Sequence, residues 1–409
     1  MKQFEIPSFY RSGFITGIKR LRSDNDRRKL NLQPTTLDFG PVRFLFARHF
    51  GFCYGVENAI EISYRAIEEN PGKRLFLLSE MIHNPHVNED LQGRGIRFLM
   101  DTSGKRLIDW KELSADDVVI VPAFGTTIEI ETELAALGVS LAKYNTTCPF
   151  VEKVWKRSNK LGAEGYTVVI HGKNDHEETR ATFSHAQSEA ASVVVRDMDE
   201  TIALAKYVTG EANLADFHKE FEGRFSEGFD VKTDLQRVGV VNQTTMLATE
   251  TQAIADYLKK VMSDKFDGEA DHFADTRDTL CYATNDNQKA TQALLEESAD
   301  LAIVVGGYNS SNTAHIVELC EEKLPTYFIG SDNDILDEQH IQHWDVHKNE
   351  LVTSKDFIKS IRPANIIVTS GASCPDSMVE RVVLKLLSFF ENCNSVEAVV
   401  EQVTEEYGV

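Results

Sequence analysis

The clearest indication of the fold is the segment Leu301-Ala302-Ile303-Val304-Val305-Gly306-Gly307-Tyr308-Asn309-Ser310-Ser311-Asn312. It joins a continuous, largely β-branched apolar run to a glycine pair and a group of small polar residues. An apolar run without alternation predicts a strand that is buried on both faces, as in a parallel sheet. Open α/β sheets bind ligands just past the carboxyl ends of their strands, which is where the polar group would lie.

The same succession of apolar run, polar turn and helical pattern recurs along the chain after Pro41, and it predicts an α/β protein with mostly parallel sheets. The predicted strands are residues 44–47, 75–78, 118–121, 167–170, 238–241, 301–305, 327–329 and 366–368.

The pattern marks off roughly three α/β units, each opening near a cysteine framed by glycine, proline or aromatic residues. We expect a three-lobed, quasi-threefold arrangement of these units around a central site. The predicted parts are an N-terminal extension (1–40), three units (41–147, 148–280 and 281–375), an acidic and partly helical surface insertion (209–236) and a helical C-terminal tail (376–409).

Composition excludes several classes of protein. The 409 residues carry 43 basic and 64 acidic side chains, and the net charge of -21 opposes binding to nucleic acid. No apolar run reaches the roughly 18 residues of a membrane span. Six cysteines in so long a chain predict reduced thiols and a cytoplasmic protein. The first forty residues are basic, and we expect them to form an arm that packs on the acidic body; an organellar targeting segment is the less favoured alternative.

Three cysteines, Cys53, Cys148 and Cys281, each follow a polar or glycine-rich loop and each open a predicted helix. Three thiolates can hold an iron-sulfur cube and leave one iron open to bind a substrate. Structural zinc sites usually contain a Cys-x-x-Cys pair, which the sequence lacks. Of the other cysteines, Cys374 lies in a loop after a strand and is the main rival as a fourth ligand.

Cys320 and Cys393 fall within predicted helices, and we expect them to be core or interface residues. Their surroundings lack the glycine, proline or loop framing of the other cysteines.

Two histidines, His83 and His176, follow predicted strands among small polar groups. If they converge with Ser310, Asn312 and Ser373, imidazole and hydroxyl donors would form an anion site suited to a diphosphate. Each histidine taken alone is as well explained as a solvated loop side chain.

Glu178 follows His176 closely and is a candidate general acid. The alternative is a surface carboxylate that pairs with Arg180, and the sequence leaves both open.

Seven segments occurring in order together resemble the LytB family, hydroxymethylbutenyl diphosphate reductase, from about Arg43 to Asp376. They are His49-Phe50-Gly51-Phe52-Cys53-Tyr54-Gly55-Val56, His83-Asn84-Pro85, Thr147-Cys148-Pro149, Asn242-Gln243-Thr244-Thr245, Cys281-Tyr282-Ala283-Thr284, Asn309-Ser310-Ser311-Asn312 and Ser370-Gly371-Ala372-Ser373.

The resemblance implies a [4Fe-4S] cluster with three cysteine ligands and one open iron, and it assigns a role to each motif. The implied cluster ligands are Cys53, Cys148 and Cys281; the implied diphosphate contacts are His83, His176, Ser310, Ser311, Asn312 and Ser373; and the implied proton donor is Glu178 with Thr244 beside it, Thr245 remaining open as the alternative.

The implied reaction is the last step of the non-mevalonate isoprenoid pathway, the reductive dehydroxylation of an allylic diphosphate to isopentenyl and dimethylallyl diphosphates. No Gly-x-Gly-x-x-Gly turn for a nicotinamide or flavin opens any unit, so we expect ferredoxin or flavodoxin to donate electrons, with the basic arm as a candidate docking patch. Two rival hypotheses are a cluster-dependent hydro-lyase, which needs no reductant, and a cluster-binding redox or iron sensor, which has no turnover.

The chain departs from the family pattern at one place that bears on the site. Many members carry a histidine in the loop where this chain has Ala123-Phe124-Gly125. Phe124 cannot make that ligand contact, so a phenyl ring is expected to line part of the cleft.

Overall fold

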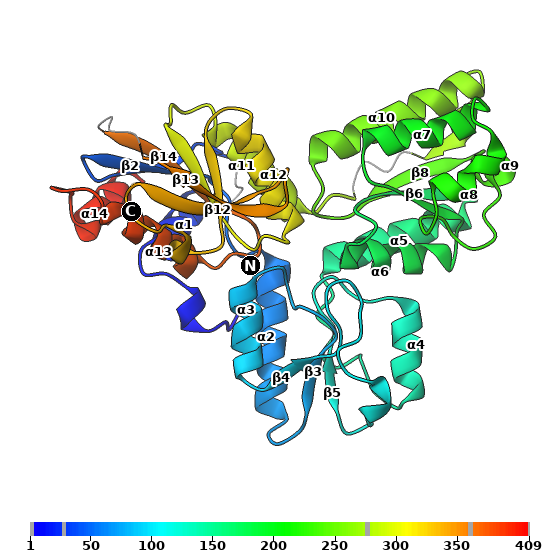
Figure 1. Cartoon of the computed structure of the whole chain (residues 1–409), viewed down its shortest axis with the longest axis horizontal. Helices are drawn as coiled ribbons and strands as arrows, with labels where there is room; N and C mark the ends of the chain where they lie inside the picture. The colour runs from blue at the N-terminus through cyan, green and yellow to red at the C-terminus, as the bar shows by residue number, and fades with distance from the viewer. Residues whose placement is uncertain (1–3, 27–29, 275–278, 359–362, 408–409) are drawn as a thin grey trace. The chain divides into compact units, whose positions relative to one another are not determined.

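The computed structural model of the chain describes residues 4–26, 30–274, 279–358 and 363–407 (Figure 1). The chain divides into two compact units, Met1–Glu57 with His83–Val87 and Tyr282–Val409, and Asn58–Ile82 with Asn88–Cys281. Two helices, α2 (Tyr54–Glu69) and α3 (Pro85–Gly93), contribute residues to both.

A five-stranded sheet with the order β1-β2-β14-β10-β11 lies at the centre of the first unit. β1 pairs with β2 in antiparallel register, and the other neighbours are parallel. The strands of this unit are β1 (Thr35–Asp38), β2 (Val42–Phe46), β10 (Leu301–Val305), β11 (Thr326–Ile329), β12 (His340–Asp345), β13 (Glu350–Lys355) and β14 (Ala364–Ser370).

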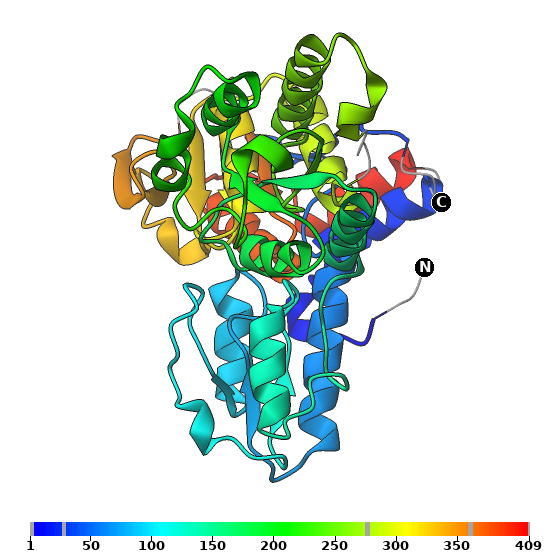
Figure 2. The ribbon, with the colours of Figure 1, turned by 90° about the vertical axis from the view of Figure 1, so that its right-hand side faces the viewer.

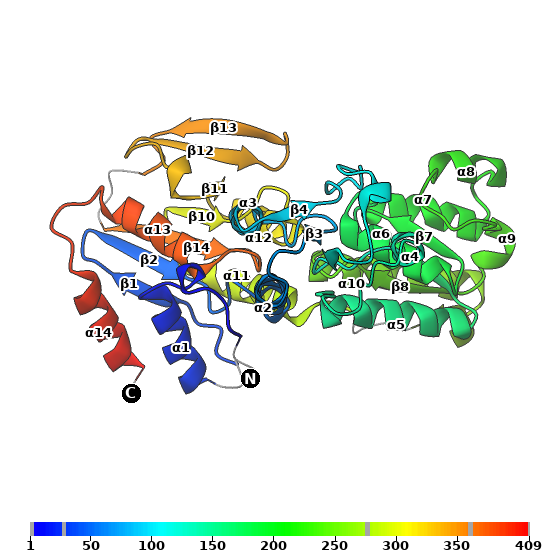
Figure 3. The same cartoon turned by 90° about the horizontal axis from the view of Figure 1, so that it is seen from below.

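The central strand β10 is buried along its whole length, as its unbroken apolar sequence predicts. Figure 3 shows α1 beside α13 and α14, and contacts join α1 to both. The helices of this unit are α1 (Ile15–Asn25), α11 (Tyr282–Leu294), α12 (Ser311–Glu321), α13 (Asp376–Leu387) and α14 (Val396–Glu406), with 3-10 turns η1 (Ser8–Tyr10) and η5 (Asp332–Asp334).

The second unit contains a four-stranded sheet of order β7-β6-β8-β9 and a three-stranded sheet of order β4-β3-β5, both parallel throughout. The strands are β3 (Leu75–Leu77), β4 (Ile96–Phe98), β5 (Val118–Ile120), β6 (Thr167–His171), β7 (Ser192–Val195), β8 (Val238–Asn242) and β9 (Phe273–Ala274).

Helices cover both faces of the four-stranded sheet. Val168 and Ile170 of β6 pack with Leu161 of α5, whereas Val169 packs on the opposite face with Leu204 of α7 and Leu258 of α10. The period of two along a strand produces this alternation, so every residue of β6 must be apolar or hydrogen-bonded. The helices of this unit are α4 (Ile128–Ala136), α5 (Pro149–Ala163), α6 (Glu177–Gln187), α7 (Met198–Thr209), α8 (Phe217–Glu220), α9 (Val231–Asp234) and α10 (Ala248–Lys265), with 3-10 turns η2 (Trp110–Glu112), η3 (Leu214–Asp216) and η4 (Ala270–His272).

In the three-stranded sheet, α4 covers one face, onto which Figure 2 looks. Leu134 of α4 packs there with Phe76, Val119 and the buried Trp110. The short strands are stabilised by this apolar contact because so few ladder hydrogen bonds join them.

The predicted acidic insertion is partly helical, as expected, but the prediction that it lies on the surface is wrong for its aromatic residues. Phe217, Phe221 and Phe229 are buried against α7 and β7, and Phe217 stacks on Phe229 with ring centroids 5.2 Å apart. Most of the charged residues between them are exposed, which is why the sequence predicted a surface insertion.

The prediction of an α/β fold with mostly parallel sheets is confirmed. The three predicted units and their boundaries remain a prediction, although β2 of the predicted first unit pairs with β14 of the third. Among the described residues, no helix is long and apolar enough to span a membrane.

Candidate active site

Three neighbouring parallel strands of the first unit bring distant motifs to one edge of a sheet. β2, β14 and β10 lie side by side, and each ends in a loop that carries predicted site residues. Cys53 follows β2, Ser373 follows β14, and Ser310 to Asn312 follow β10. The parallel register therefore gathers these residues at the carboxyl edge, as the switch-point rule predicts.

The Cys53 loop is tied to the loop after β14 through the backbone. The Cys53 N–H donates to the carbonyl of Ala372 over 3.2 Å, and the Cys53 carbonyl accepts from Glu57 N–H at 3.0 Å in the first turn of α2. Burial raises the pKa of the Cys53 thiol above its usual value. The cysteine thus immediately precedes α2, the helix that the amphipathic pattern of residues 56–69 predicted.

At the N-terminus of α12, one buried side-chain N–H group has no hydrogen-bond acceptor among the described residues. The Ser310 side chain caps the helix by accepting from Thr313 N–H at 3.3 Å. Asn312 Oδ1 accepts from Ala372 N–H at 2.9 Å, whereas Asn312 Nδ2 is buried with no hydrogen-bond partner among the described residues. A buried amide donor without a partner is costly unless a ligand satisfies it. Ser311 beside it is also buried.

His83 and Asn84 reach this edge from the segment before α3. Ser373 Oγ donates to the His83 carbonyl at 3.2 Å, and Asn84 Nδ2 donates to the Ser373 carbonyl at 2.8 Å. A Cβ on Gly307 would lie 2.4 Å from the His83 carbonyl oxygen, so only glycine fits there. Asn84 was not predicted as a site residue; its place beside His83 in a polar strand-end motif was the available signal.

In the second unit, neighbouring strands β6 and β8 bring Glu178 and Thr244 together. Thr244 donates twice to the carboxylate, from its N–H to Oε1 at 2.5 Å and from its hydroxyl to Oε2 at 2.9 Å. Glu178 is 1% exposed, so it is not a surface carboxylate. Arg180 instead donates to the backbone carbonyl oxygens of Asp175 and Thr102. A buried carboxylate held by two donors has a fixed orientation, as a positioned acid requires.

Gln243 joins the loop before Glu178 to the first turn of α6, a role that the sequence did not predict. Its Oε1 accepts from Lys173 N–H at 3.1 Å and from Thr179 Oγ1 at 3.0 Å. Its Nε2 donates to Thr245 Oγ1 at 2.6 Å, so the Thr245 hydroxyl faces Gln243 while Thr244 faces the carboxylate. Gln243 is fully buried, so its amide and the three groups that it contacts depend on one another for their hydrogen bonds.

His176 begins α6 as its N-terminal cap. Its Nδ1 accepts from Glu178 N–H at 3.1 Å, so Nε2 is the ring nitrogen that can carry a proton and donate. The Phe124 ring meets the imidazole edge to face, with centroids 5.6 Å apart. Gly125 beside it has φ of +78°, and a Cβ there would lie 2.5 Å from Trp155, so the loop conformation is fixed by glycine.

Cys148 and Cys281 lie in the second unit, each immediately before a helix. Cys148 caps α5, with its N–H bonded to the Ala123 carbonyl at 2.9 Å, and Cys281 precedes α11. None of the six cysteines forms a disulfide bond. Among the residues that the structure describes, no three His, Cys, Asp or Glu side chains form a group that could hold a metal ion.

The remaining cysteines differ in their surroundings. Cys374 and Cys320 are both fully buried, and burial raises the pKa of each to about 12. Cys393 is half-buried and donates to the Phe390 carbonyl.

Comparison with known proteins places the chain in a family. The LytB protein model matches residues 44–387. The 4-hydroxy-3-methylbut-2-enyl diphosphate reductase of Prochlorococcus marinus (strain NATL1A) is 37% identical over 388 residues, covering 94% of this chain and 91% of that protein. The enzyme of the same name from Gloeobacter violaceus (strain ATCC 29082 / PCC 7421) is 39% identical over 356 residues, covering 86% of this chain and 84% of the relative.

Among solved structures, the E-1-hydroxy-2-methyl-but-2-enyl-4-diphosphate reductase from Plasmodium falciparum has a similar fold, with a TM-score of 0.62, 19% identity, and coverage of 90% of this chain and 99% of that one. The likeness in fold agrees with the sequence match over most of the length. The chain therefore belongs to the LytB protein family.

Proposed function

We propose that the protein is an oxidoreductase that converts 4-hydroxy-3-methylbut-2-enyl diphosphate to isopentenyl and dimethylallyl diphosphates, the last step of the non-mevalonate isoprenoid pathway. The names of its relatives support this activity. The observation that carries it is the buried Glu178 carboxylate held by Thr244, because reductive loss of a hydroxyl group as water consumes protons that a positioned acid can supply.

The diphosphate is bound by amide, hydroxyl and imidazole hydrogen-bond donors, and not by a lysine. In the first unit, the Asn312 amide and the hydroxyls of Ser310, Ser311 and Ser373 act together with the His83 side chain. These groups gather near the N-terminus of α12, where the helix dipole favours an anion. In the second unit, His176 supplies Nε2–H as a donor. Phe124 adds an apolar wall beside it.

Glu178 is the proton donor. Thr244 donates a hydrogen bond to each of its two carboxyl oxygens. Its backbone N–H donates to Nδ1 of His176, so the proton donor and the histidine that binds the diphosphate are hydrogen-bonded to each other at the N-terminus of α6. Protonation of the allyl species at either end of its three-carbon unit gives the two products. The acid is buried, so water is kept from competing for the proton.

The cofactor is a [4Fe-4S] cluster held by Cys53, Cys148 and Cys281. The residues fit it in chemistry, since all three are cysteines outside any disulfide bond and each immediately precedes a helix. When bound, the cluster would pass two electrons from an external donor to the substrate, one at a time, and its open iron would act as a Lewis acid. Cys53 belongs to the first unit, and Cys148 and Cys281 belong to the second.

Electrons come from an external ferredoxin or flavodoxin, and the protein is cytoplasmic. The basic arm is a poorer docking patch for an acidic donor than its sequence suggested. Lys19 pairs with Asp376 at 2.7 Å, and the buried Arg22 donates to Thr35 and to the Gln33 carbonyl. Lys19 and Arg22 therefore bind groups of this chain and are less able to bind an acidic partner.

The test is an anaerobic assay of the reconstituted protein with the hydroxylated allylic diphosphate, with and without a reduced viologen. Formation of both C5 diphosphates only with reductant supports the reductase. Product without reductant would favour the hydro-lyase, and cluster without product would favour the sensor.

A further inference from the structure

The N-terminal extension contacts the start of α13 through one carboxylate. Both oxygens of Asp376 are taken by α1: Oδ1 accepts from Lys19 Nζ at 2.7 Å, and Oδ2 accepts from Thr16 Oγ1 at 2.9 Å. One turn further along α13, Glu380 accepts from Phe14 N–H at 3.1 Å. Each contact joins the extension to α13, which immediately follows the Ser373 loop.

The ion pair also touches the Cys53 loop. A Cβ on Gly51 would lie 2.6 Å from Asp376 Oδ1 and 2.8 Å from Lys19 Nζ, so the bare glycine backbone lies directly against the pair. Lys19 Nζ is also 4.9 Å from the centroid of the Phe50 ring. Because the side chains of Lys19 and Asp376 are only 27% and 13% exposed, water screens this contact weakly.

Aromatic residues of the extension pack on the neighbouring residues of the same loop. Tyr10, which is buried, meets Phe52 edge to face with centroids 5.7 Å apart. Phe4 meets Tyr54 in the same way at 4.9 Å. Phe50, Gly51, Phe52 and Tyr54 are therefore each contacted by the extension, and Cys53 lies among them.

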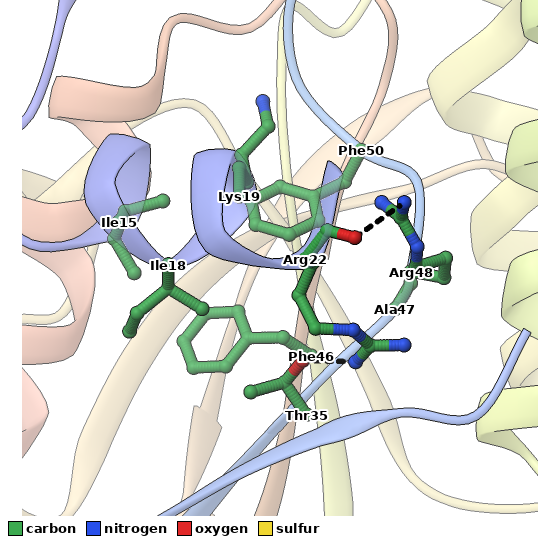
Figure 4. Close-up of a pocket in the computed structure, with 9 residues that line it drawn as sticks. All are labelled: Ile15, Ile18, Lys19, Arg22, Thr35, Phe46, Ala47, Arg48 and Phe50. Carbon is green, nitrogen blue, oxygen red and sulfur yellow. Dashed lines mark hydrogen bonds between the residues drawn. The ribbon is translucent and has the colours of Figure 1, made fainter. Parts of the chain in front are cut away.

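A small cavity beneath α1 is lined by residues of the extension and of β2 with its following loop (Figure 4). Arg48 donates to the Arg22 carbonyl there at 3.3 Å, and Figure 4 shows the Lys19 side chain extending away from both guanidinium groups. The cavity has room for about one water molecule. The Arg48 bond therefore joins the loop after β2 to α1 at a second point, besides the ion pair.

We propose that residues 4–25 are a positioning element for the Cys53 loop, with Lys19 and Thr16 on Asp376 as its central contact. This inference rests on the proposed function for the role of Cys53 as a ligand. The Cys53 N–H is bonded to Ala372, and Asp376 lies four residues after Ala372, so the ion pair fixes both loops against each other. The extension is thus part of the ligand-holding structure and not an appended arm.

The test measures the exchange of backbone amides in the protein without its cluster. Lys19→Met and Asp376→Asn each remove the ion pair and keep most of the side-chain volume. We expect deuterium uptake in peptides covering residues 48–56 to become about tenfold faster, equivalent to about 1.4 kcal/mol. The double variant is expected to be no faster than either single variant, because both lose the same contact.

Arg20→Met is the matched control, since Arg20 lies on the same helix with its side chain 82% exposed. It is expected to leave uptake and the midpoint of thermal unfolding unchanged. Unchanged uptake in Lys19→Met would overturn the proposal. A uniform rise in uptake across the first unit with a lower unfolding midpoint would also overturn it, because that pattern describes general loss of stability.

A second readout uses the protein with its cluster, in which release of iron to a chelator is followed by absorbance. Lys19→Met is expected to release iron several-fold faster than wild type and Arg20→Met at the wild-type rate. Equal rates in all three proteins would contradict a positioning role. If wild type takes up no iron, the proposed function fails, whereas the exchange experiment still decides whether the extension fixes the loop.

Discussion

Thr244 gives both of its donors to one carboxylate, with its N–H 2.5 Å from Glu178 Oε1 and its hydroxyl 2.9 Å from Oε2. The N–H bond is set by the backbone and the hydroxyl bond by the side chain, so a substitution can remove one and leave the other. This separation makes the arrangement testable without removing the acid itself.

Thr244→Val should lower turnover roughly 2- to 10-fold, because losing the hydrogen bond that orients the Glu178 carboxyl group costs about 0.5–1.5 kcal/mol. The remaining N–H bond should keep the fold and the cluster content intact. Turnover per cluster is the measurement, with Thr245→Val compared in parallel. A larger loss in Thr245→Val would contradict the assignment of Thr244.

Glu178→Gln should nearly abolish turnover, by about 100-fold or more, while the protein still folds and binds substrate. The amide oxygen can accept the Thr244 N–H, and the amide nitrogen can donate to the Thr244 hydroxyl oxygen. Single-turnover kinetics with reduced protein measure this effect. Wild-type rates would show that the proton comes from another group.

Asn312→Asp should weaken the binding of inorganic pyrophosphate about 10- to 100-fold. The change keeps the Oδ1 that accepts from Ala372 N–H, removes the buried amide donor and adds negative charge. Calorimetric titration measures the affinity. Asn333→Asp adds the same charge at an exposed position of the first unit and should have little effect.

Phe124→His should lower KM for the diphosphate substrate by roughly three- to tenfold, since an imidazole beside His176 adds a hydrogen-bond donor. The gain should be larger at pH 6 than at pH 8, because a protonated imidazole binds an anion more strongly. Steady-state kinetics at the two pH values provide the measurement. A KM that does not change would remove residue 124 from the substrate site.

Gly51→Ala should lower the free energy of unfolding by about 3 kcal/mol. Gly51 has φ of +76°, and the new Cβ would meet Asp376 at 2.6 Å. Gly17→Ala is the control, because nothing lies within 4 Å of its Cβ position in α1, and it should stabilise the protein by about 0.5–1 kcal/mol. Urea unfolding of both variants gives the comparison.

Much of the fold followed from the sequence because buried parallel strands are continuous apolar runs. The run Leu301–Val305 forms β10 with the predicted bounds, and Leu75–Leu78 forms β3 to within one residue. The hairpin of β12 and β13 was not predicted, since strands such as Glu350–Lys355 are largely exposed and polar. Their stability comes from pairing, which a local pattern does not report.

Pairing between distant strands was the other information that the sequence lacked. Nothing in residues 42–46 indicates that β2 lies beside β14, yet this pairing brings the Cys53 and Ser373 loops together. For the same reason the hydrogen bonds of Gln243 to Lys173 and Thr179 and the contact of Lys19 with Asp376 could not be predicted. Each joins residues that are far apart in the chain.

The most direct measurement is a Mössbauer spectrum of the anaerobically purified protein, before and after addition of the hydroxylated allylic diphosphate. We expect a four-iron cube in which one distinct iron changes its signal when the substrate is added. We also expect each of the variants Cys53→Ser, Cys148→Ser and Cys281→Ser to lose the cube. A spectrum without that cube, or an iron signal that the substrate leaves unchanged, would contradict the proposed function.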